Sequence, residues 1–305
     1  QVCPNAEFSP YGKYRKDIFD LPAWDNSKTA AENVASIRIG EDRPELVVSY
    51  LVGGLAGVSL NCPVATQFNE AFDTQKVDRF VRQNKISLAV FHHENDMSRY
   101  WWWEDLGIRR VHLPHCASEK VYYPQDNIAV QDKPIDILVA GNLNSYYYPF
   151  RYRLKELARE RFRKRGYKVV ILGHPGYELP PRKGTVVGMD FARVLAKSKL
   201  VVTCSMRFNY ALAKYAEIAL CRSLAVADIP GERKEFFGDT ILNVEPWMSD
   251  QQIARKIEDV LDHEGGLLES LTVHAYDRTV DTSTMSHYAS KFVRVARVHL
   301  EAWHG

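Results

Sequence analysis

Short apolar runs alternate with helical stretches along this chain, and that alternation restricts the fold more than any other feature. In the first half, apolar runs at residues 44–52, 86–93 and 109–114 flank a helical stretch at 77–84. Strands of a parallel sheet are buried on both faces by helices, so they appear as continuous apolar runs. We therefore predict a mainly parallel sheet, covered by helices on both faces, in this half.

The same alternation restarts after a break. Residues 121–134 are polar, contain two prolines and follow neither a helical nor a strand period, so we interpret them as an interdomain linker. Beyond them we predict strands at 135–142, 167–173, 199–202, 223–228 and 240–244, and helices at 152–166, 191–198, 249–262 and 286–303. The prediction is two α/β domains, residues 1–125 and 126–285, followed by a C-terminal helix at 286–305.

Composition excludes several classes of protein. The chain has 305 residues, 46% of them hydrophobic, and a net charge of only +2, so we expect a globular protein without a nucleic-acid partner. No uncharged apolar run reaches the ~18 residues of a membrane span, and residues 1–17 lack the apolar core of a signal peptide. The five cysteines are scattered without a CxxC pair, which predicts no disulfide framework, no metal site and a cytoplasmic location.

Residues 203–228 carry the most informative candidate site. They follow an apolar strand as a loop and then turn helical, with Tyr210, Lys214 and Glu217 spaced i, i+4, i+7 and thus expected on one helical face. Loops at the carboxyl ends of strands form the ligand crevice of α/β sheets, so a cation and a carboxylate here suit a phosphate and a sugar hydroxyl. The alternative is a surface ion pair between Lys214 and Glu217, worth about 0.3–0.5 kcal/mol.

Two other strand ends of the second half suit an anion. Gly141-Asn142 directly follows one strand, and Arg151 stands near the start of the next helix, where free N–H groups favour negative charge. The spacing is neither that of a dinucleotide-binding turn nor that of a P-loop. His174 opens a Pro-Gly turn after the next strand, where an imidazole can bond a base, ribose or phosphate; the alternative is a ring in solvent.

In the first half, His93, Glu94 and Asp96 come at the end of an apolar strand, and we take them as candidate general bases. Gly53 and Gly54 follow the first strand and are our candidate acceptor loop, where they admit a ligand close to the backbone; the alternative is a tight turn.

The run from Arg151 to Arg165 holds eight basic residues among fifteen. Such a run usually forms the solvated face of an amphipathic helix. Contact with an anionic membrane surface or a polyanionic acceptor is the second interpretation.

Taken together, these segments resemble the GT-B glycosyltransferases, and within them the branch that includes the spore-maturation protein CgeB and related "glycosyl transferases group 1" proteins. The resemblance rests on VHLPHCASEKVYYP, IDILVAGNLNSYYYPFRYRLKEL, HPGY, the segment from LAKSKLVVTCS to ERKEFF, and MSDQQIARKIEDVLD. It covers residues 109–303 and is weak over 1–108. It implies two Rossmann-like domains facing each other across a cleft, an acceptor domain at 1–125 and a nucleotide-sugar donor domain at 126–285, with the C-terminal helix crossing back to pack on the first.

The resemblance also implies residue roles. Glu217 is expected to hold ribose hydroxyls of a nucleotide sugar, with Lys214 and Arg151 near its diphosphate. Further donor contacts are expected from Gly141, Asn142, His174, Ser205 and Tyr210. Arg222 departs from the family pattern, which has glycine there; a cation at this position either fills an empty space or pairs with an extra negative charge on an acidic donor sugar.

The function predicted on this basis is metal-independent transfer of a sugar from a nucleotide-mono- or diphosphate sugar to a hydroxyl acceptor such as a glycan, with no separate cofactor. The expected setting is cell-surface or other glycoconjugate synthesis, in the cytoplasm or peripherally at the inner membrane face. An inverting reaction needs a base and a retaining one does not, and the residues leave both open. The alternatives are a nucleotide-sugar epimerase or hydrolase of the same fold, and a non-catalytic module that binds glycans or polyanions.

Overall fold

The computed structural model describes residues 45–50, 62–125, 128–174, 186–263 and 266–304, and within it the chain forms two compact units. Unit 1 joins the chain up to Pro114 to the stretch from Tyr288 onward, and unit 2 runs from His115 to His287. The sequence prediction placed these boundaries at residues 125–126 and 285–286. The segment 121–134 belongs to unit 2, where Val130 is part of the hydrophobic core.

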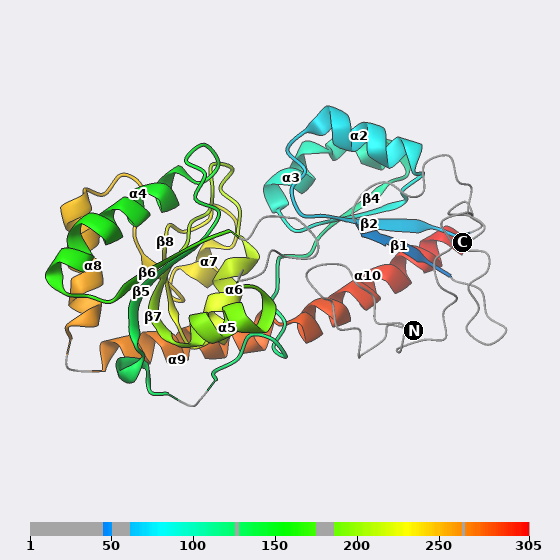
Figure 1. Cartoon of the computed structure of the whole chain (residues 1–305). Helices are drawn as coiled ribbons and strands as arrows, with labels where there is room; N and C mark the ends of the chain where they lie inside the picture. Colours follow the sequence, from blue (N-terminus) through cyan, green and yellow to red (C-terminus); the bar gives the residue numbers. More distant parts are fainter. Residues whose placement is uncertain (1–44, 51–61, 126–127, 175–185, 264–265, 305) are drawn as a thin grey trace. The chain divides into compact units, whose positions relative to one another are not determined.

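The elements follow the predicted alternation (Figure 1). Unit 1 contains β1 (Val47–Tyr50), β2 (Val64–Phe68), α2 (Thr74–Gln83), β3 (Leu88–Phe91), α3 (Glu94–Arg99), the 3₁₀ helix η1 (Trp101–Leu106), β4 (Arg109–His112) and most of α10 (Met285–His304). Unit 2 contains η2 (Val130–Asp132), β5 (Ile135–Gly141), α4 (Pro149–Leu157), η3 (Ala158–Phe162), η4 (Arg163–Arg165), β6 (Val169–Gly173), α5 (Gly188–Ala196), β7 (Ser198–Val202), α6 (Ala213–Leu220), β8 (Leu224–Ala227), α7 (Lys234–Phe237), β9 (Leu242–Asn243), α8 (Asp250–Leu261) and α9 (Leu267–Thr282).

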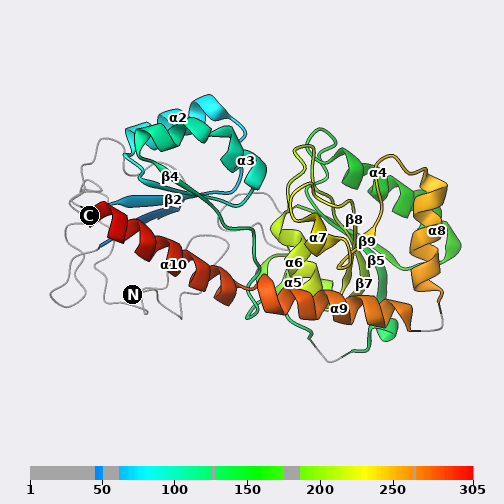
Figure 2. The same cartoon turned by 180° about the vertical axis from the view of Figure 1, so that it is seen from behind.

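The unit 1 sheet is parallel, in the order β1-β2-β3-β4. Because strand side chains alternate between faces, Ala89 and Phe91 of β3 pack with the buried side chains of α2 and η1, whereas Leu88 and Val90 belong to the opposite cluster. Tyr288, Phe292 and Val295 of α10 pack against that second cluster. Figure 2 shows α10 running along this sheet.

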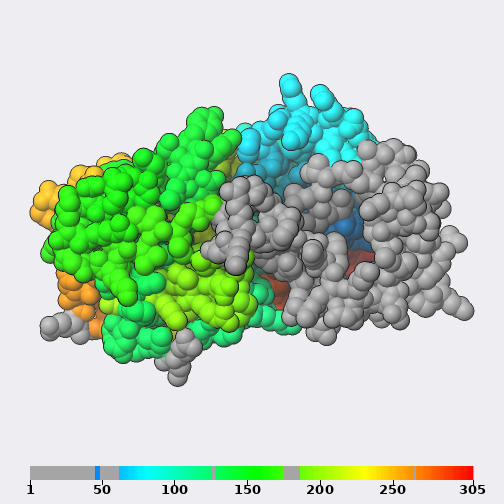
Figure 3. Space-filling model, viewed as in Figure 1, coloured from blue at the N-terminus to red at the C-terminus, as the bar shows by residue number. Residues whose placement is uncertain are grey.

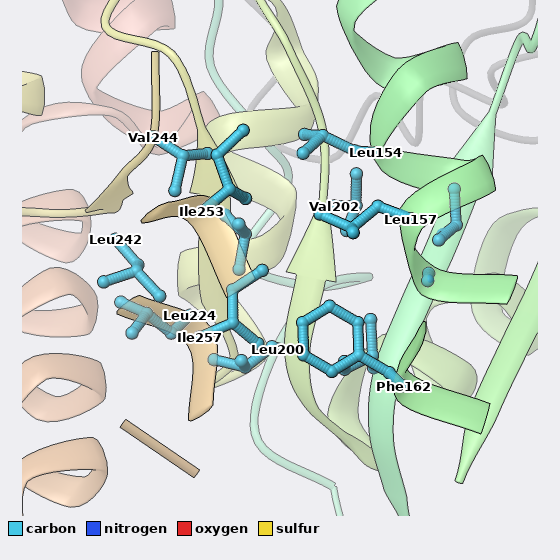
Figure 4. Packing of buried hydrophobic residues seen from close by; sticks show 14 of the residues in the cluster. Leu154, Leu157, Phe162, Leu200, Val202, Leu224, Leu242, Val244, Ile253 and Ile257 are labelled. Atoms are coloured by element: carbon cyan, nitrogen blue, oxygen red, sulfur yellow. The ribbon is translucent and has the colours of Figure 1, made fainter. Parts of the chain in front are cut away.

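The unit 2 sheet is parallel as well, in the order β6-β5-β7-β8-β9. One face packs on α4 and α8, and Figure 4 shows side chains such as Leu157, Leu200 and Ile257 meeting there. The other face packs on α5, α6 and α7 through residues such as Val201 and Ile218. In the space-filling view, most of the visible surface of unit 2 comes from the green and yellow-green part of the chain, which carries β5 through α6 (Figure 3).

Several elements escaped the sequence prediction, among them β2, α3, α7 and α9. β2 lies second in the unit 1 sheet and α9 packs beside α6 and η2 in unit 2, but neither was predicted. Helix α9 was missed because two of its four buried positions are polar: Leu268, Thr272, Ala275 and Thr279 face the core, so the sequence shows no continuous apolar stripe. Among the described residues, no helix combines the length and apolarity needed to cross a bilayer.

Lys133 lies at the end of the sheet where the strands begin. Its side chain is 4% exposed, and its ammonium donates to the carbonyl oxygens of Ser198 (3.3 Å), Cys221 (3.3 Å) and Arg222 and to Ser223 Oγ (3.2 Å). Two of these carbonyls end α6, so the lysine caps that helix. Burial lowers the pKa of Lys133 from its ordinary value of 10.5 to about 8.

This lowered pKa predicts a pH-dependent contribution to stability. Between pH 8 and 10.5 the folded chain loses the Lys133 proton while the unfolded chain keeps it, so unfolding takes up a proton and becomes less favourable as pH rises. The unfolding free energy of the wild type minus that of Lys133→Met should therefore rise with pH across this window. Urea denaturation of both proteins at about pH 7.5, 8.5 and 9.5 measures it; a difference that stays flat contradicts the assignment.

Candidate anion site at the switch point of the second sheet

The direction of the chain across the unit 2 sheet reverses between β5 and β7. From β5 the chain crosses to β6 on one side, and it then returns to β7 on the other. At such a switch point the two loops leave in opposite directions and open a crevice outside the carboxyl ends of the strands, which is where ligands of doubly wound sheets bind. Gly141 ends β5 and Thr203 follows β7, so these two residues border the crevice.

Arg151 fills the bottom of this crevice. The guanidinium donates from Nη1 to the carbonyl oxygen of Asn142 (3.2 Å) and from Nη2 to Thr203 Oγ1 (3.0 Å), and it lies 4.5 Å from the ring centroid of Tyr148. It therefore joins the loop after β5 to the loop after β7. Gly141 makes room for it: the residue has φ +107°, and a Cβ there would stand 3.0 Å from Arg151 Nη1.

Among the residues that the structure describes, no carboxylate pairs with the buried charge of Arg151. The side chain is 2% exposed, the carbonyl of Asn142 and the hydroxyl of Thr203 that accept from it are neutral, and Nε has no hydrogen-bond partner within the described part of the chain. Burying an unpaired cation costs several kcal/mol. Such an arrangement is one that an anionic ligand stabilises.

Lys214 lies beside the same opening. Its Cε would be 3.9 Å from a Cβ at Gly141. The ammonium pairs with Glu217 Oε2 at 2.9 Å and lies 4.2 Å from the centroid of the Phe191 ring. The ion pair that the sequence left as an alternative is thus present in the structure, with both side chains largely covered. A role of either residue in binding a ligand stays a prediction.

His174 lies near the two cations Arg151 and Lys214. It directly follows β6, and its pKa is lowered from 6.5 by burial and, next, by the charges of Lys214 and Arg151. The imidazole is therefore neutral at pH 7, and an anion bound among these groups would move its pKa upward. The rest of the predicted turn, residues 175–177, lies outside the described residues, as do Gly53 and Gly54.

A second layer of contacts ties the loop after β7 to the loop after β8. Asp228 accepts hydrogen bonds from the backbone N–H of Ser205 (2.9 Å) and from its hydroxyl (2.5 Å). Glu232, which is buried, accepts from the backbone N–H of Ala211 (2.7 Å). These contacts hold the loop after β7 in one shape next to Arg151.

The third tie between these loops is a close backbone approach. Asn209 Oδ1 accepts from the backbone N–H of Gly231 at 2.8 Å, and a Cβ at Gly231 would stand only 2.1 Å from Asn209 Nδ2. Met206 and Asn209 both adopt positive φ, 52° and 61°, which non-glycine residues keep only where the surroundings hold them.

The structure corrects the predicted position of Tyr210. Helix α6 begins at Ala213 with Leu212 as its N-cap, so Tyr210 lies in the preceding loop and shares no helical face with Lys214 and Glu217. It is fully buried, and its ring lies 5.6 Å from that of Phe208. The reason is the tight turn over residues 206–209, which a helix starting earlier would not allow. Lys214 and Glu217 do lie one turn apart on α6.

The structure also corrects the interpretation of Arg222. It stands at the residue after the C-cap of α6, where the N–H of Arg222 bonds the carbonyl of Ala219 (2.9 Å) and that of Ser223 bonds the carbonyl of Ile218 (3.2 Å). This is a Schellman motif, whose first residue after the cap is left-handed and most often glycine; Arg222 has φ 50°. Its guanidinium lies 5.0 Å from the ring centroid of Tyr276. Because Arg222 precedes β8, it lies at the amino edge of the sheet, away from the crevice.

In unit 1, the three candidate bases lie around the start of α3. Asp96 is 1% exposed, and it accepts from the backbone N–H of Ala71 (2.7 Å), so it fastens the loop after β2. His93 is the buried N-cap of α3, and Glu94 is exposed. Glu70 lies close enough to His93 and Asp96 for their charges to act on its pKa, which burial raises. A role of any of the three as general base stays a prediction.

The basic run 151–165 is largely neutralised by acidic side chains. Lys155 and Arg159 pair with Glu156, and Lys164 pairs with Glu160. Arg161 and Arg165 both pair with Glu258 of α8. Arg151 is the buried member of the run, and it does not share this pairing.

Comparison with known proteins gives a match in structure alone. No family model matches the chain, and no curated protein matches its sequence. Among solved structures, it superposes on sucrose-phosphate synthase from Thermosynechococcus elongatus with a TM-score of 0.53 and 12% identity, covering 85% of this chain and 74% of that one. An alpha,alpha-trehalose-phosphate synthase (UDP-forming) from Burkholderia vietnamiensis gives 0.55 and 11%, covering 79% and 67%. HepE of Anabaena, in complex with UDP and glucose, gives 0.54 and 11%, covering 77% and 72%.

The chain has the GT-B fold. Two parallel sheets of four and five strands with flanking helices match these glycosyltransferase structures, and the predicted fold class is confirmed. At identities of 11–12% the likeness shows the fold alone. The activity therefore has to be argued from the site.

Several residues that build the site were not singled out from the sequence. Thr203 accepts from Arg151, while Asp228, Glu232 and Gly231 position the loop after β7. Asp228 could have been singled out from the sequence, because it is a carboxylate directly after a buried strand. The pairing of Asn209 with Gly231 could not have been predicted, because it joins two loops through a backbone N–H.

Gly141 is predicted to be irreplaceable. In Gly141→Ala the new Cβ meets Arg151 Nη1 at 3.0 Å on a backbone with φ +107°, so we expect a loss of about 1–2 kcal/mol of stability together with weaker anion binding. Gly173→Ala is the matched control: Gly173 pairs with Gly141 across the strands and has open space at its Cβ. Urea denaturation of both variants measures the effect, and equal losses in the two would contradict the account.

Arg222→Gly is predicted to leave the anion site intact. Glycine removes roughly 1–2 kcal/mol of left-handed strain and loses about 0.5–1 kcal/mol of contact with Tyr276, so the unfolding free energy should stay equal or rise slightly. Nucleotide affinity should not change. A marked loss of nucleotide binding in this variant would restore Arg222 to the donor site.

Proposed function

We propose that this protein transfers a sugar from a nucleotide-diphosphate sugar to a hydroxyl acceptor. The observation that carries the proposal is the buried Arg151 at the switch point, which no described carboxylate pairs and which has Lys214 and His174 beside it. A diphosphate supplies the negative charge that this cluster lacks. HepE of Anabaena, which shares the fold, was solved with UDP-glucose, and this supports a nucleotide sugar as the ligand here.

In the proposed reaction, the chain stabilises charge that develops on the departing diphosphate. The guanidinium of Arg151 and the ammonium of Lys214 are already in place before the bond to the sugar breaks, so little reorganisation is needed. His174 is neutral in the free protein and is able to take up a proton as negative charge accumulates beside it. Glu217, held by Lys214 at 2.9 Å, would accept hydrogen bonds from the ribose hydroxyls.

Lys214 has two roles in this scheme. In the free protein it neutralises Glu217, and with donor bound it would turn part of its charge toward the diphosphate. The pair thus keeps a carboxylate next to an anion site without repelling the ligand. This explains why a cation and a carboxylate stand three residues apart on α6 at the mouth of the crevice.

The finer assignments follow from the sequence resemblance. We place the protein near the CgeB-like branch of the GT-B enzymes, in synthesis of a glycoconjugate. A cytoplasmic location and peripheral contact with the inner membrane face remain predictions of the sequence, as does the choice among His93, Glu94 and Asp96 as base for an inverting reaction.

Nucleotide binding is the first test. In a thermal-shift panel with UDP, GDP, CMP and dTDP, we expect a diphosphate to stabilise the protein by about 2.7 kcal/mol at a hundred times its Kd. Lys214→Ala and Glu217→Ala should each weaken this stabilisation, and they should raise the KM for the donor or abolish turnover while the protein stays folded.

Lys199→Ala provides the matched control, because Lys199 pairs with Asp136 at 2.7 Å with a similar degree of exposure, away from the crevice. It should lose a comparable ion pair and keep wild-type nucleotide binding. A panel in which no nucleotide stabilises the protein would favour a glycan-binding module, and wild-type turnover in both site variants would overturn the site assignment.

A further inference from the structure

The last helix, α10, has one face that packs on unit 1 and an opposite face that lies in solvent. Tyr288, Phe292 and Val295 contact the apolar cluster on the sheet, and Ala296 and His299 are buried. Figure 2 shows α10 as a long helix (red) beside that sheet. The packed face accounts for these five residues, and the solvent face remains to be explained.

Three cations form a row on the solvent face. Lys291, Arg294 and Arg297 are spaced i, i+3, i+6, and all three are exposed, so they lie on neighbouring turns and span about 9 Å of the helix axis. Phe292 and Arg294 are about 200° apart around the helix, which places the row opposite the packed face. Glu301 is the single acidic residue of α10, so this row has an excess of positive charge.

In the part of the chain that the structure describes, no carboxylate pairs with any of these three cations. The basic run at 151–165 differs in this respect. There the exposed cations Arg159, Lys164 and Arg165 each contact a carboxylate, at 2.7, 3.2 and 2.5 Å. The unbalanced positive charge is thus found on α10, and not on the run that the sequence singled out for contact with an anionic surface.

An apolar side chain lies among the cations. Val298 is four residues after Arg294 and seven after Lys291, so it shares their side of the helix, and it is 43% exposed. The alkyl stems of lysine and arginine add apolar surface next to it, with the charge at the tip of each side chain. We call these four residues, with Arg297, the cationic face of α10.

We propose that the cationic face of α10 binds the surface of an anionic lipid bilayer. Cations close to such a surface are attracted by its negative potential. Val298 and the alkyl stems then have a place at the boundary between headgroups and acyl chains, as in helices that lie in the plane of a membrane. Three cations give a contact of moderate strength that reverses readily.

A nucleic acid fits this face less well. The whole chain carries a net charge of only +2, so binding to a phosphate backbone would release few counterions. Stacking on bases needs exposed aromatic rings, but Phe292, which lies between the cations in the sequence, packs on the sheet. The lipid contact goes beyond the proposed function and does not depend on it, because Arg151 and Lys214 belong to unit 2.

Co-sedimentation of the full chain with lipid vesicles is the test. The probes are vesicles of phosphatidylcholine alone and vesicles that also contain about one third phosphatidylglycerol. Binding is expected to the anionic vesicles only, and it should fall as NaCl rises from about 0.1 M to about 0.5 M. The triple variant Lys291→Gln, Arg294→Gln, Arg297→Gln should bind them roughly a hundredfold more weakly.

The matched control loses the same charge at paired positions, through Arg159→Gln, Lys164→Gln and Arg165→Gln in one chain. It should bind the anionic vesicles nearly as well as the wild type. Val298→Ser keeps every charge and should weaken binding by roughly threefold, as expected for an apolar side chain that leaves water on binding. All of these variants should keep the wild-type response to UDP in the thermal-shift panel.

Equal losses in the two triple variants would overturn the inference, because they would show a response to net charge alone. Binding of a short duplex DNA that the α10 variant loses, without vesicle binding, would assign the face to a nucleic acid and overturn it as well. A wild type that binds UDP but no anionic vesicle overturns this inference and leaves the proposed function standing. Vesicle binding without nucleotide binding does the reverse.

Discussion

The contact of Arg151 with the loops after β5 and β7 is the interaction on which the site depends. Its guanidinium is 2% exposed and donates to the carbonyl of Asn142 and the hydroxyl of Thr203, both neutral. Hydrogen bonds of this kind fix the geometry of a buried cation but do not balance its charge. The crevice is therefore both rigid and short of an anion, and the glycine at position 141 is what leaves room for the guanidinium there.

The rest of unit 2 keeps these groups in place. Buried side chains on both faces make the sheet rigid, while Asp228, Glu232 and Gly231 hold the loop after β7 against the loop after β8. That loop carries two non-glycine residues at positive φ, a conformation that costs free energy and is kept only by surrounding contacts. The cationic cluster of Arg151 and Lys214 thus results from loops at a single edge of one sheet.

Most strands of this fold were predictable from the sequence because buried parallel strands appear as apolar runs, as residues 135–142 and 223–228 do. Strand β2 was missed because its sequence, VATQF, contains two polar residues. Gly141, Arg151 and Lys214 were predictable because each stands at a strand end or on the following helix, and the structure brings them together. The position of Tyr210 was predicted wrongly because Met206 and Asn209 adopt positive φ, which delays the start of the helix. Asparagine tolerates that conformation but methionine rarely adopts it, so residue type signals it only weakly. The role of Arg222 was misinterpreted because the position follows the end of a helix, where a left-handed backbone favours glycine. The residue type alone does not show whether a glycine is needed for its backbone conformation or for the space that it leaves.

The central claim is that the cationic crevice between β5 and β7 holds the diphosphate of a nucleotide sugar. A crystal structure of the protein with UDP tests this most directly. The account predicts phosphate oxygens within hydrogen-bond distance of Arg151 and Lys214, beside the backbone of Gly141, with the ribose hydroxyls on Glu217. UDP bound elsewhere on the chain, or a crevice in which a carboxylate has paired with Arg151 and excluded the nucleotide, would contradict it.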